Sequence, residues 1–151
     1  EYGQAVWNPQ AKGDIKRIEA VQRSATRQIN GFKDMTYWER LQSLKLPTLA
    51  CRRDRGDMIE VFKILHGLYD PQCVPLLQRS NSSTRGHSFK LFKRRTLKLN
   101  LRKHFFTNRV VDLWNSLPAT VVEASSLNSF KNQIDKYWNS TGKLYCTEGL
   151  L

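Results

Sequence analysis

Residues 102–118 read RKHFFTNRVVDLWNSLP, and this stretch decides how the second half of the chain folds. Its apolar residues recur three or four positions apart, the spacing of one face of an α-helix: Phe106, Val110, Leu113, Trp114 and Leu117. Pro118 ends the pattern because proline lacks the N–H that a helix interior needs. Arg102 and Lys103 then fall in the first turn of the helix, where its dipole disfavours cations. We therefore expect a phosphate near this turn.

This helix lies at the end of a stretch without acidic residues. Residues 71–111 contain no Asp or Glu but ten basic residues: Arg79, Arg85, Lys90, Lys93, Arg94, Arg95, Lys98, Arg102, Lys103 and Arg109. The stretch therefore carries +10 of the formal net charge of +12. Such a concentration of cations, with Phe, Leu and His between them, suits the neutralisation of successive phosphates. It predicts contact with a polyanion.

Helical patterns also dominate the first half and the end of the chain. Residues 1–7 indicate the end of a helix or strand, stopped by Asn8-Pro9. Two further helices are expected at residues 13–31 (Ile15, Ile18, Ala25 and Ile29 on one face, Gly31 as cap) and at residues 36–44 (Thr36 and Glu39 as capping box). A third begins with Pro47 in its first turn, carries Leu49, Met58, Phe62, Leu65 and Leu68, and ends near Gly67 or Asp70-Pro71. The last begins at about Ser126, with Leu127, Phe130, Ile134, Tyr137 and Trp138 inward.

Residues 87–101 follow a different pattern, after a loop-like stretch that ends at Gly86. Apolar and polar residues alternate over Phe89–Leu91 and again over Leu97–Leu101, with cations at 93–95 between them. This pattern predicts a small β-hairpin with a basic turn. The expected fold is therefore mainly α, a bundle of about five helices with the basic hairpin inserted near residues 87–101. Gly86 suits a turn with positive φ.

Composition limits the class of protein. The chain has 151 residues, of which 40% are hydrophobic and 25% charged, which is typical of one globular domain. No apolar run approaches the ~20 residues that span a bilayer, and no secretory signal precedes the first helix, so we expect no membrane contact. Three well-separated cysteines (Cys51, Cys73 and Cys146) favour reduced thiols in the nucleus or cytoplasm. The chain begins at Glu1, without a Met, and so reads as a piece of a longer protein.

We find no pattern typical of an active site. The cysteines lie 22 and 73 residues apart, whereas zinc ligands come in close pairs, so no metal site and no cofactor is predicted. His66 falls on an apolar helix face and is interpreted as a core histidine. Asp54, Asp57 and Glu60 alternate with Arg52, Arg53 and Arg55, which favours a solvated, salt-bridged helix face over a pair of catalytic acids. No catalytic residue is predicted.

The four tryptophans (Trp7, Trp38, Trp114 and Trp138) and seven phenylalanines could stack on bases, but most of this aromatic set falls on predicted core faces, which favours core packing. Phe89 and Phe92 are exceptions because a short hairpin can bury only one of its faces. They are the candidate stacking residues for a base or a ribose.

Several strings resemble the region after the polymerase in non-long-terminal-repeat (LINE-type) retrotransposon reverse transcriptases of the jockey and chicken-repeat group. The strings are EY (1–2), VWNP (6–9), IEAVQRSAT (18–26), YWERL (37–41), RRDRGDMIEVFK (52–63), TRGH (84–87), RKHFFTNRVVDLWNSLP (102–118) and SFK (129–131). The resemblance covers about residues 1–138, and the string at 102–118 is the most specific. The palm motif with its Asp-Asp pair and the Cys/His knuckle of some members are absent from these residues.

The resemblance implies a fragment that is not itself an enzyme, taken from an RNA-directed DNA polymerase. Residues 1–70 would be a helical, thumb-like segment, residues 71–138 the basic hairpin with C-terminal helices packed on it, and residues 139–151 a frayed tail. The implied partners are RNA, an RNA–DNA or DNA duplex, and the upstream polymerase and endonuclease domains of the same polyprotein.

From both lines of reasoning we expect a module that binds template RNA or RNA–DNA duplex through the backbone. The candidate binding residues are Arg85, His87, Lys90, Lys93, Arg94, Arg95, Lys98, Arg102, Lys103 and Arg109. Arg85 could equally brace a helix C-terminus. The alternative is a helical scaffold or protein-interaction module, in a decayed or host-adopted copy of the element.

Overall fold

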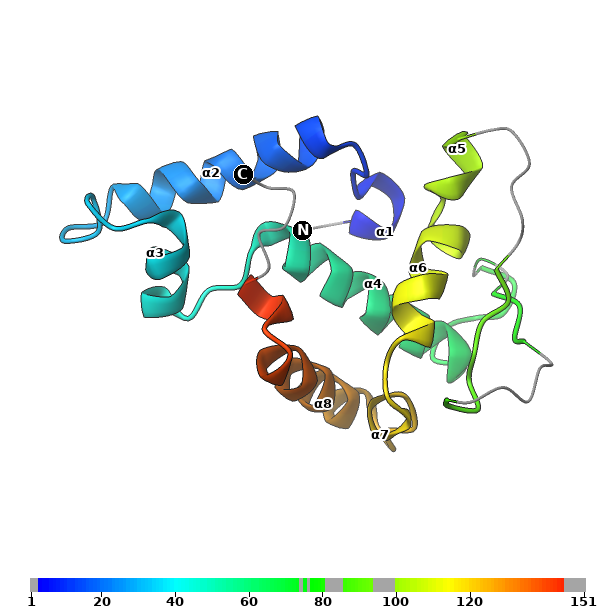
Figure 1. Ribbon diagram of the computed structural model, residues 1–151. Helices are drawn as coiled ribbons and strands as arrows, with labels where there is room; N and C mark the ends of the chain where they lie inside the picture. The colour runs from blue at the N-terminus through cyan, green and yellow to red at the C-terminus, as the bar shows by residue number, and fades with distance from the viewer. Residues whose placement is uncertain (1–2, 74, 76, 81–85, 94–99, 146–151) are drawn as a thin grey trace.

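The computed structural model describes residues 3–73, 75, 77–80, 86–93 and 100–145 (Figure 1). Over these residues the protein is mainly helical, as the sequence predicted. In chain order the elements are α1 (Gln4–Trp7), α2 (Lys12–Arg27), α3 (Tyr37–Leu44), α4 (Leu49–Leu65), α5 (Asn100–Lys103), α6 (Phe106–Asn115), α7 (Ala119–Val122), α8 (Leu127–Ser140) and the 3-10 turn η1 (Lys143–Tyr145). Across these ranges, no helix has the length and apolar character needed to cross a membrane.

The core lies where α4 packs against α6 and α8. We call these three helices, together with α7, the body. The Phe62 and Phe130 rings stack with their centroids 4.4 Å apart, and Trp114 lies 5.9 Å from Phe130. Burial of side chains of this size stabilises the fold by about 1.5–3 kcal/mol each. The predicted face of residues 106–117 is confirmed: Val110, Trp114 and Leu117 are buried, and Phe106 and Leu113 pack against the core.

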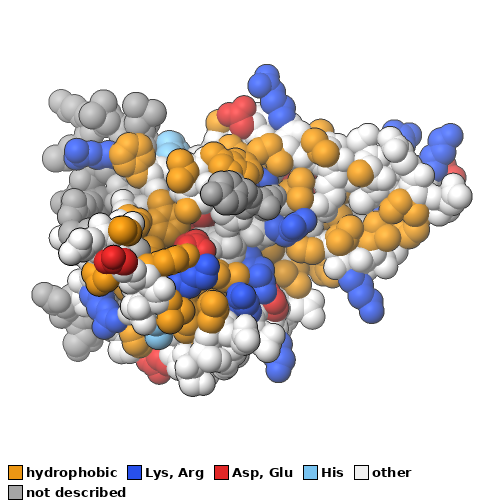
Figure 2. All heavy atoms as spheres, turned by 180° about the vertical axis from the view of Figure 1, so that it is seen from behind, with side chains coloured by type: hydrophobic (Ala, Val, Ile, Leu, Met, Phe, Trp, Pro, Cys, Tyr) orange, Lys and Arg blue, Asp and Glu red, His pale blue; other side chains and the backbone are white. Residues whose placement is uncertain are grey.

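The helices α2 and α3, which we call the arm, extend away from the body (Figure 1). The buried residues of α2 are Glu19 and Thr26, both polar, whereas Val21 is 69% exposed. Ile29, expected on a buried face, lies beyond the end of α2 and is exposed. Figure 2 shows apolar side chains at the surface of the arm. The periodicity therefore located this helix correctly, but its apolar face does not enter the core.

Capping residues set the ends of α3 and α4. The predicted capping box of Thr36 and Glu39 opens α3. Pro47 was predicted in the first turn of α4 but precedes this helix. Thr48 is the N-cap: its hydroxyl accepts a hydrogen bond from the amide of Cys51, 3.1 Å away. Leu68, predicted to lie on the apolar face of this helix, follows its C-terminal end and is exposed.

The predicted β-hairpin is not shown by the structure. One isolated antiparallel bridge joins Arg79 to Leu91, upstream of the expected second strand. Residues 94–99 lie outside the described residues, and Asn100 and Leu101 belong to α5. Arg102 and Lys103 therefore occupy the last turn of α5, where the helix dipole favours cations, and not the first turn of α6. The helix dipole therefore gives no reason to expect a phosphate at these two cations.

The C-terminal helix begins as predicted, with Ser126 as its N-cap. Fraying was expected from residue 139, but α8 continues to Ser140 and η1 follows it. Leu144 packs against the core, and its carbonyl accepts a hydrogen bond from the amide of Thr48. Because α4 shares one core with α6 and α8, the boundary expected at residue 70 does not divide the core.

Candidate nucleic-acid interface

Residues 86–93, which we call the basic strap, are bound along α6 by alternate residues. The Nε1 of Trp114 donates a hydrogen bond to the Phe89 carbonyl at 2.8 Å. The Nε2 of His87 lies 3.2 Å from the Trp114 carbonyl; a carbonyl only accepts, so this nitrogen carries the proton. Gly86 opens the strap with φ of +125°, a value that favours glycine. The strap therefore begins at a fixed place on the body.

Asn115 holds the middle of the strap as a neighbouring β-strand would. Its side-chain amide accepts from the N–H of Leu91 and donates to the carbonyl of Leu91, both at 2.9 Å. On the other edge of the strap, two backbone hydrogen bonds flank the bridge between Arg79 and Leu91. The amide of Ser80 donates to the Lys90 carbonyl, and the amide of Phe92 donates to the Gln78 carbonyl. Leu91 is buried in the core between these partners. The partner of this strand is thus a side chain of α6 together with residues 78–80.

Lys93, the last described residue of the strap, forms an ion pair with Asp112 of α6. Both side chains are largely exposed, so the pair contributes only about 0–1 kcal/mol to stability. An exposed pair of this kind exchanges readily with another anion. The strap therefore delivers an ammonium group to α6 and holds it weakly there.

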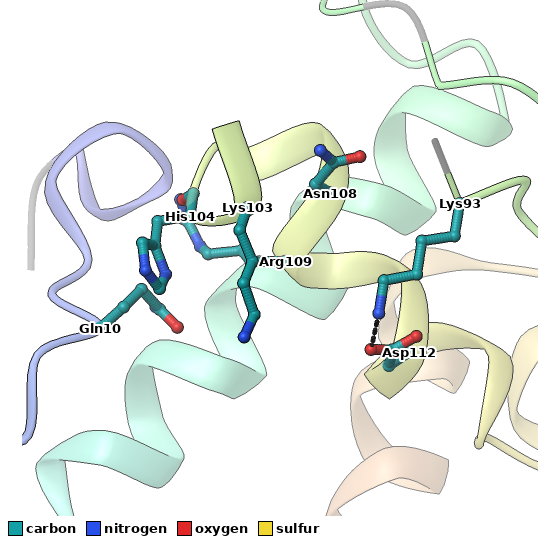
Figure 3. Close-up of a pocket in the computed structure, with 7 residues that line it drawn as sticks. All are labelled: Gln10, Lys93, Lys103, His104, Asn108, Arg109 and Asp112. Atoms are coloured by element: carbon teal, nitrogen blue, oxygen red, sulfur yellow. Dashed lines mark hydrogen bonds and ion pairs between the residues drawn. The ribbon is translucent and has the colours of Figure 1, made fainter. Parts of the chain in front are cut away.

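Lys93 lines a pocket of about 320 Å³ that gathers cations from separate parts of the chain. Figure 3 shows His104 and Gln10 at one end, Lys93 and Asp112 at the other, and Lys103 between them. The lining residues are Gln10, Lys93, Lys103, His104, Asn108, Arg109 and Asp112. Lys103 and His104 are exposed, as is their neighbour Arg102. This basic pocket is the candidate site for an anionic group.

Arg109 lines the basic pocket, but its guanidinium mainly bonds groups within the protein. Its Nε and Nη2 donate to the two carboxylate oxygens of Asp57 at 3.0 and 3.1 Å, and its Nη2 also donates to the Ala5 carbonyl at 2.8 Å. Both side chains of the ion pair are more than nine-tenths buried. The prediction that Arg109 binds nucleic acid is corrected, because its guanidinium is used to join α1, α4 and α6. The expected solvated face at Asp57 was wrong for the same reason.

His87 is a second correction. Only 4% of its surface is exposed, so it cannot extend the basic surface as predicted. Burial lowers the pKa of His87, opposed in part by its hydrogen bond to the Trp114 carbonyl. The imidazole is therefore a neutral anchor of the strap.

Phe89 and Phe92 have different surroundings. The ring of Phe89 stacks on His66 with the ring centroids 5.3 Å apart, and the guanidinium carbon of Arg79 lies 4.6 Å from the Phe89 centroid. Phe89 is therefore already packed within the protein. His66 itself caps α4 at an exposed position and is not the core residue that its apolar helix face predicted. Phe92 is 53% exposed and remains a candidate stacking residue.

The other predicted binding residues are placed as follows. Lys90 is partly buried beside Gly86. Arg85, Arg94, Arg95 and Lys98 lie outside the described residues. The structure thus brings Lys93 and Lys103 together in one pocket, and the exposed Arg102 precedes Lys103 in α5.

Sequence reasoning missed the polar residues that build this interface. Asn115 and Asp112 hold the strap, and Asn108 supports the pocket by donating to the Arg102 carbonyl at 2.9 Å. The signal for Asn115 was its place beside Trp114 in the most specific string. Elsewhere, burial raises the pKa of the Cys51 thiol to about 12, which disfavours its thiolate form. Within the part of the chain that the structure describes, no three His, Cys, Asp or Glu side chains group to hold a metal ion.

The candidate interface is therefore a pocket lined by two exposed lysines, the carboxylate of Asp112 and neutral polar groups, with Arg102 next to Lys103 in the chain. No Ser, Thr or Cys is among its lining residues. Comparisons of the chain with protein families, with curated proteins and with solved structures find no match.

Proposed function

We propose that this chain is a nucleic-acid-binding C-terminal part of a non-long-terminal-repeat retrotransposon reverse transcriptase. It grips template RNA or an RNA–DNA duplex through the phosphate backbone and supplies no catalytic residue. The observation that carries the proposal is the basic pocket. Lys93 from the basic strap and Lys103 from α5 line this one cavity. The resemblance of the string at 102–118 supports the parent enzyme.

Backbone contacts of this kind position a nucleic acid without reading its sequence. Binding should therefore be weakly selective for sequence and steeply dependent on salt. If about six to ten phosphates are contacted, affinity should fall by roughly 10³–10⁵ between 50 and 200 mM salt. Fluorescence anisotropy with a labelled RNA and with an RNA–DNA duplex measures this slope directly. A flat salt dependence contradicts the proposal.

A triple variant tests the two lysines of the pocket together with the neighbouring Arg102: Lys93→Gln, Arg102→Gln and Lys103→Gln. These cations are exposed, so the fold should survive, and the slope of log K against log salt should fall by about one for each phosphate contact removed. The matched control is Lys12→Gln, Lys33→Gln and Lys136→Gln, which removes the same charge at exposed positions away from the pocket. Equal losses in both triples would mean that only net charge matters.

The alternative function is a helical scaffold whose cations contact acidic surfaces of the same polyprotein or of a host partner. The exposed apolar residues of the arm, such as Val21, favour it. Replacing Lys93, Arg94, Arg95 and Lys98 with Gln discriminates the two functions. RNA binding should be abolished if the chain binds nucleic acid and unchanged if it is a scaffold.

A further inference from the structure

The basic pocket also contains hydrogen-bond acceptors, which a site for phosphate alone does not need. Asp112 contributes a carboxylate, and its Oδ2 accepts from Lys93. A carboxylate has two oxygens and about four lone-pair positions, so this ion pair leaves Asp112 with further capacity to accept. Asn108 uses its Nδ2 to donate to the Arg102 carbonyl, which leaves its side-chain oxygen to act as an acceptor. Donors for phosphate and acceptors for a hydroxyl thus line one cavity.

The charge of the pocket suits a phosphodiester. Lys93 and Lys103 are two cations that reach the cavity, and Asp112 offsets one of them. Arg109, the third cation, is already neutralised by Asp57. A pocket with this balance matches the single negative charge of an internal phosphodiester better than the double charge of a terminal phosphate.

We infer that the basic pocket binds one ribose-phosphate unit of RNA, with Asp112 accepting a hydrogen bond from the ribose 2′-hydroxyl and Lys93 and Lys103 contacting the phosphate. The inference rests on the proposed function and names the strand that the site holds. The 2′-hydroxyl lies next to the 3′-phosphate on the same ribose, as the carboxylate of Asp112 lies next to the ammonium of Lys93. The 2′-hydroxyl is the group by which a protein distinguishes RNA from DNA.

The size and exposure of the pocket agree with this ligand. A volume of about 320 Å³ is at the small end of ligand pockets, which suits a sugar and one phosphate and not a stacked base as well. The Lys93–Asp112 pair is exposed and weak, so the phosphate can take over the ammonium while Asp112 turns to the hydroxyl. The neutral amides of Gln10 and Asn108 add no charge that would favour a dianion.

The test compares one oligonucleotide sequence in three chemistries: RNA, DNA and 2′-O-methyl RNA. The full 151-residue chain should bind the RNA about three- to tenfold more tightly than either of the others, the effect of one solvent-exposed hydrogen bond. The readout is the ratio of dissociation constants. A ratio is used because any variant that removes an acidic residue strengthens binding to all three polyanions.

Asp112→Ala should bring the ratio close to one, and Asp112→Asn, whose amide oxygen still accepts, should retain part of it. Asp34→Ala is the control, because Asp34 is exposed on the arm and its removal changes net charge equally. Circular dichroism checks the fold of each variant. Strong binding with a ratio near one, or a ratio that Asp112→Ala leaves unchanged, overturns the inference while the proposed function stands. If none of the three oligonucleotides binds, the proposed function itself has failed, and the inference fails with it.

Discussion

The buried side chains of the body are mostly apolar, whereas those of α2 in the arm are polar. In the body, α4, α6 and α8 meet through apolar residues such as Phe62, Trp114 and Phe130. In the arm, the side chains that fix α2 are polar: Glu19 accepts from the hydroxyl of Tyr37 at 2.5 Å and from the amides of Leu49 and Ala50 at the start of α4. Apolar burial gives the body its stability, whereas a few directional bonds set how the arm is attached.

The carboxylate of Glu19 can be buried between α2 and α4 because the start of α4 supplies hydrogen-bond donors. The first amides of a helix lack partners within the helix, and the helix dipole favours an anion at that end. The side chain of Glu19 satisfies two of these amides and so joins α2 to α4. Burial, and then the bond to Glu19, raises the pKa of Tyr37, which keeps its hydroxyl protonated as the donor. The arm is therefore sensitive to single polar substitutions that would barely affect an exposed helix.

The largest expected effect tests whether polar bonds matter in the body too. Arg109→Gln should destabilise the protein by about 3–5 kcal/mol, because it leaves the buried carboxylate of Asp57 without its charged partner. Urea unfolding measures the loss. Arg102→Gln, which changes an exposed arginine in the same sequence string, should stay within about 0.5 kcal/mol of the wild type. Similar values for the two variants would contradict the structural role of Arg109.

A smaller and more local effect is expected at the junction of arm and body. Glu19→Ala should cost about 1–3 kcal/mol for the amides it leaves unsatisfied. Hydrogen exchange should accelerate at Leu49 and Ala50 while the amides of α8 stay protected. Asp14→Ala, at an exposed position of the same helix, is the control. Uniform loss of protection across α8 would show that the arm and the body unfold together.

The capping box at the start of α3 should have a smaller effect again. Thr36→Ala removes the hydroxyl that accepts from the amide of Glu39 and should cost about 1 kcal/mol in urea unfolding. Hydrogen bonds from Thr36 lower the pKa of Glu39, in agreement with an intact box. Thr120→Ala replaces an exposed threonine of α7 and should cause no comparable loss.

Local sequence signals predicted the helices well. The capping box of Thr36, the start of the last helix near Ser126 and the apolar face that includes Trp114 are all confirmed, because each depends on residues within a few positions of one another. The prediction of a β-hairpin at the basic strap failed because its contacts are distant in sequence. The alternation of apolar and polar residues predicted that a second strand after Leu91 would pair with the first. In the structure, the backbone of Leu91 pairs with Arg79 on one side and with the side chain of Asn115, 24 residues away, on the other. Nothing near Leu91 in the sequence indicates either partner.

The candidate site was predictable as a charged stretch but not residue by residue. A run of cations cannot show which of them find an internal carboxylate, since the Asp57 that pairs with Arg109 is 52 residues away. The same limit applies to His87, whose burial depends on α6 folding over it. Lys93 and Lys103 belong to the same pocket because the strap is bound to α6, which is a property of the tertiary fold.

The smallest predicted effect concerns the pH dependence of the body and follows from His87. Burial lowers the pKa of this histidine in the folded protein below its ordinary value of 6.5. The unfolded chain therefore binds a proton that the folded protein does not, so stability is full above about pH 6.5 and falls as the pH decreases toward the folded pKa. The Nδ1 of His87 is buried without a partner among the described atoms, so protonation there places a charge that nothing nearby accepts.

Urea unfolding between pH 5 and pH 8 checks this sign, because at lower pH the wild type should unfold at lower urea. His87→Gln keeps a donor for the Trp114 carbonyl but does not titrate, so its stability should vary less over that range. His104→Gln, at an exposed position of the basic pocket, should keep the wild-type dependence. If His104→Gln removed the dependence and His87→Gln did not, the pH sensitivity would belong to the basic pocket and not to the anchor of the strap.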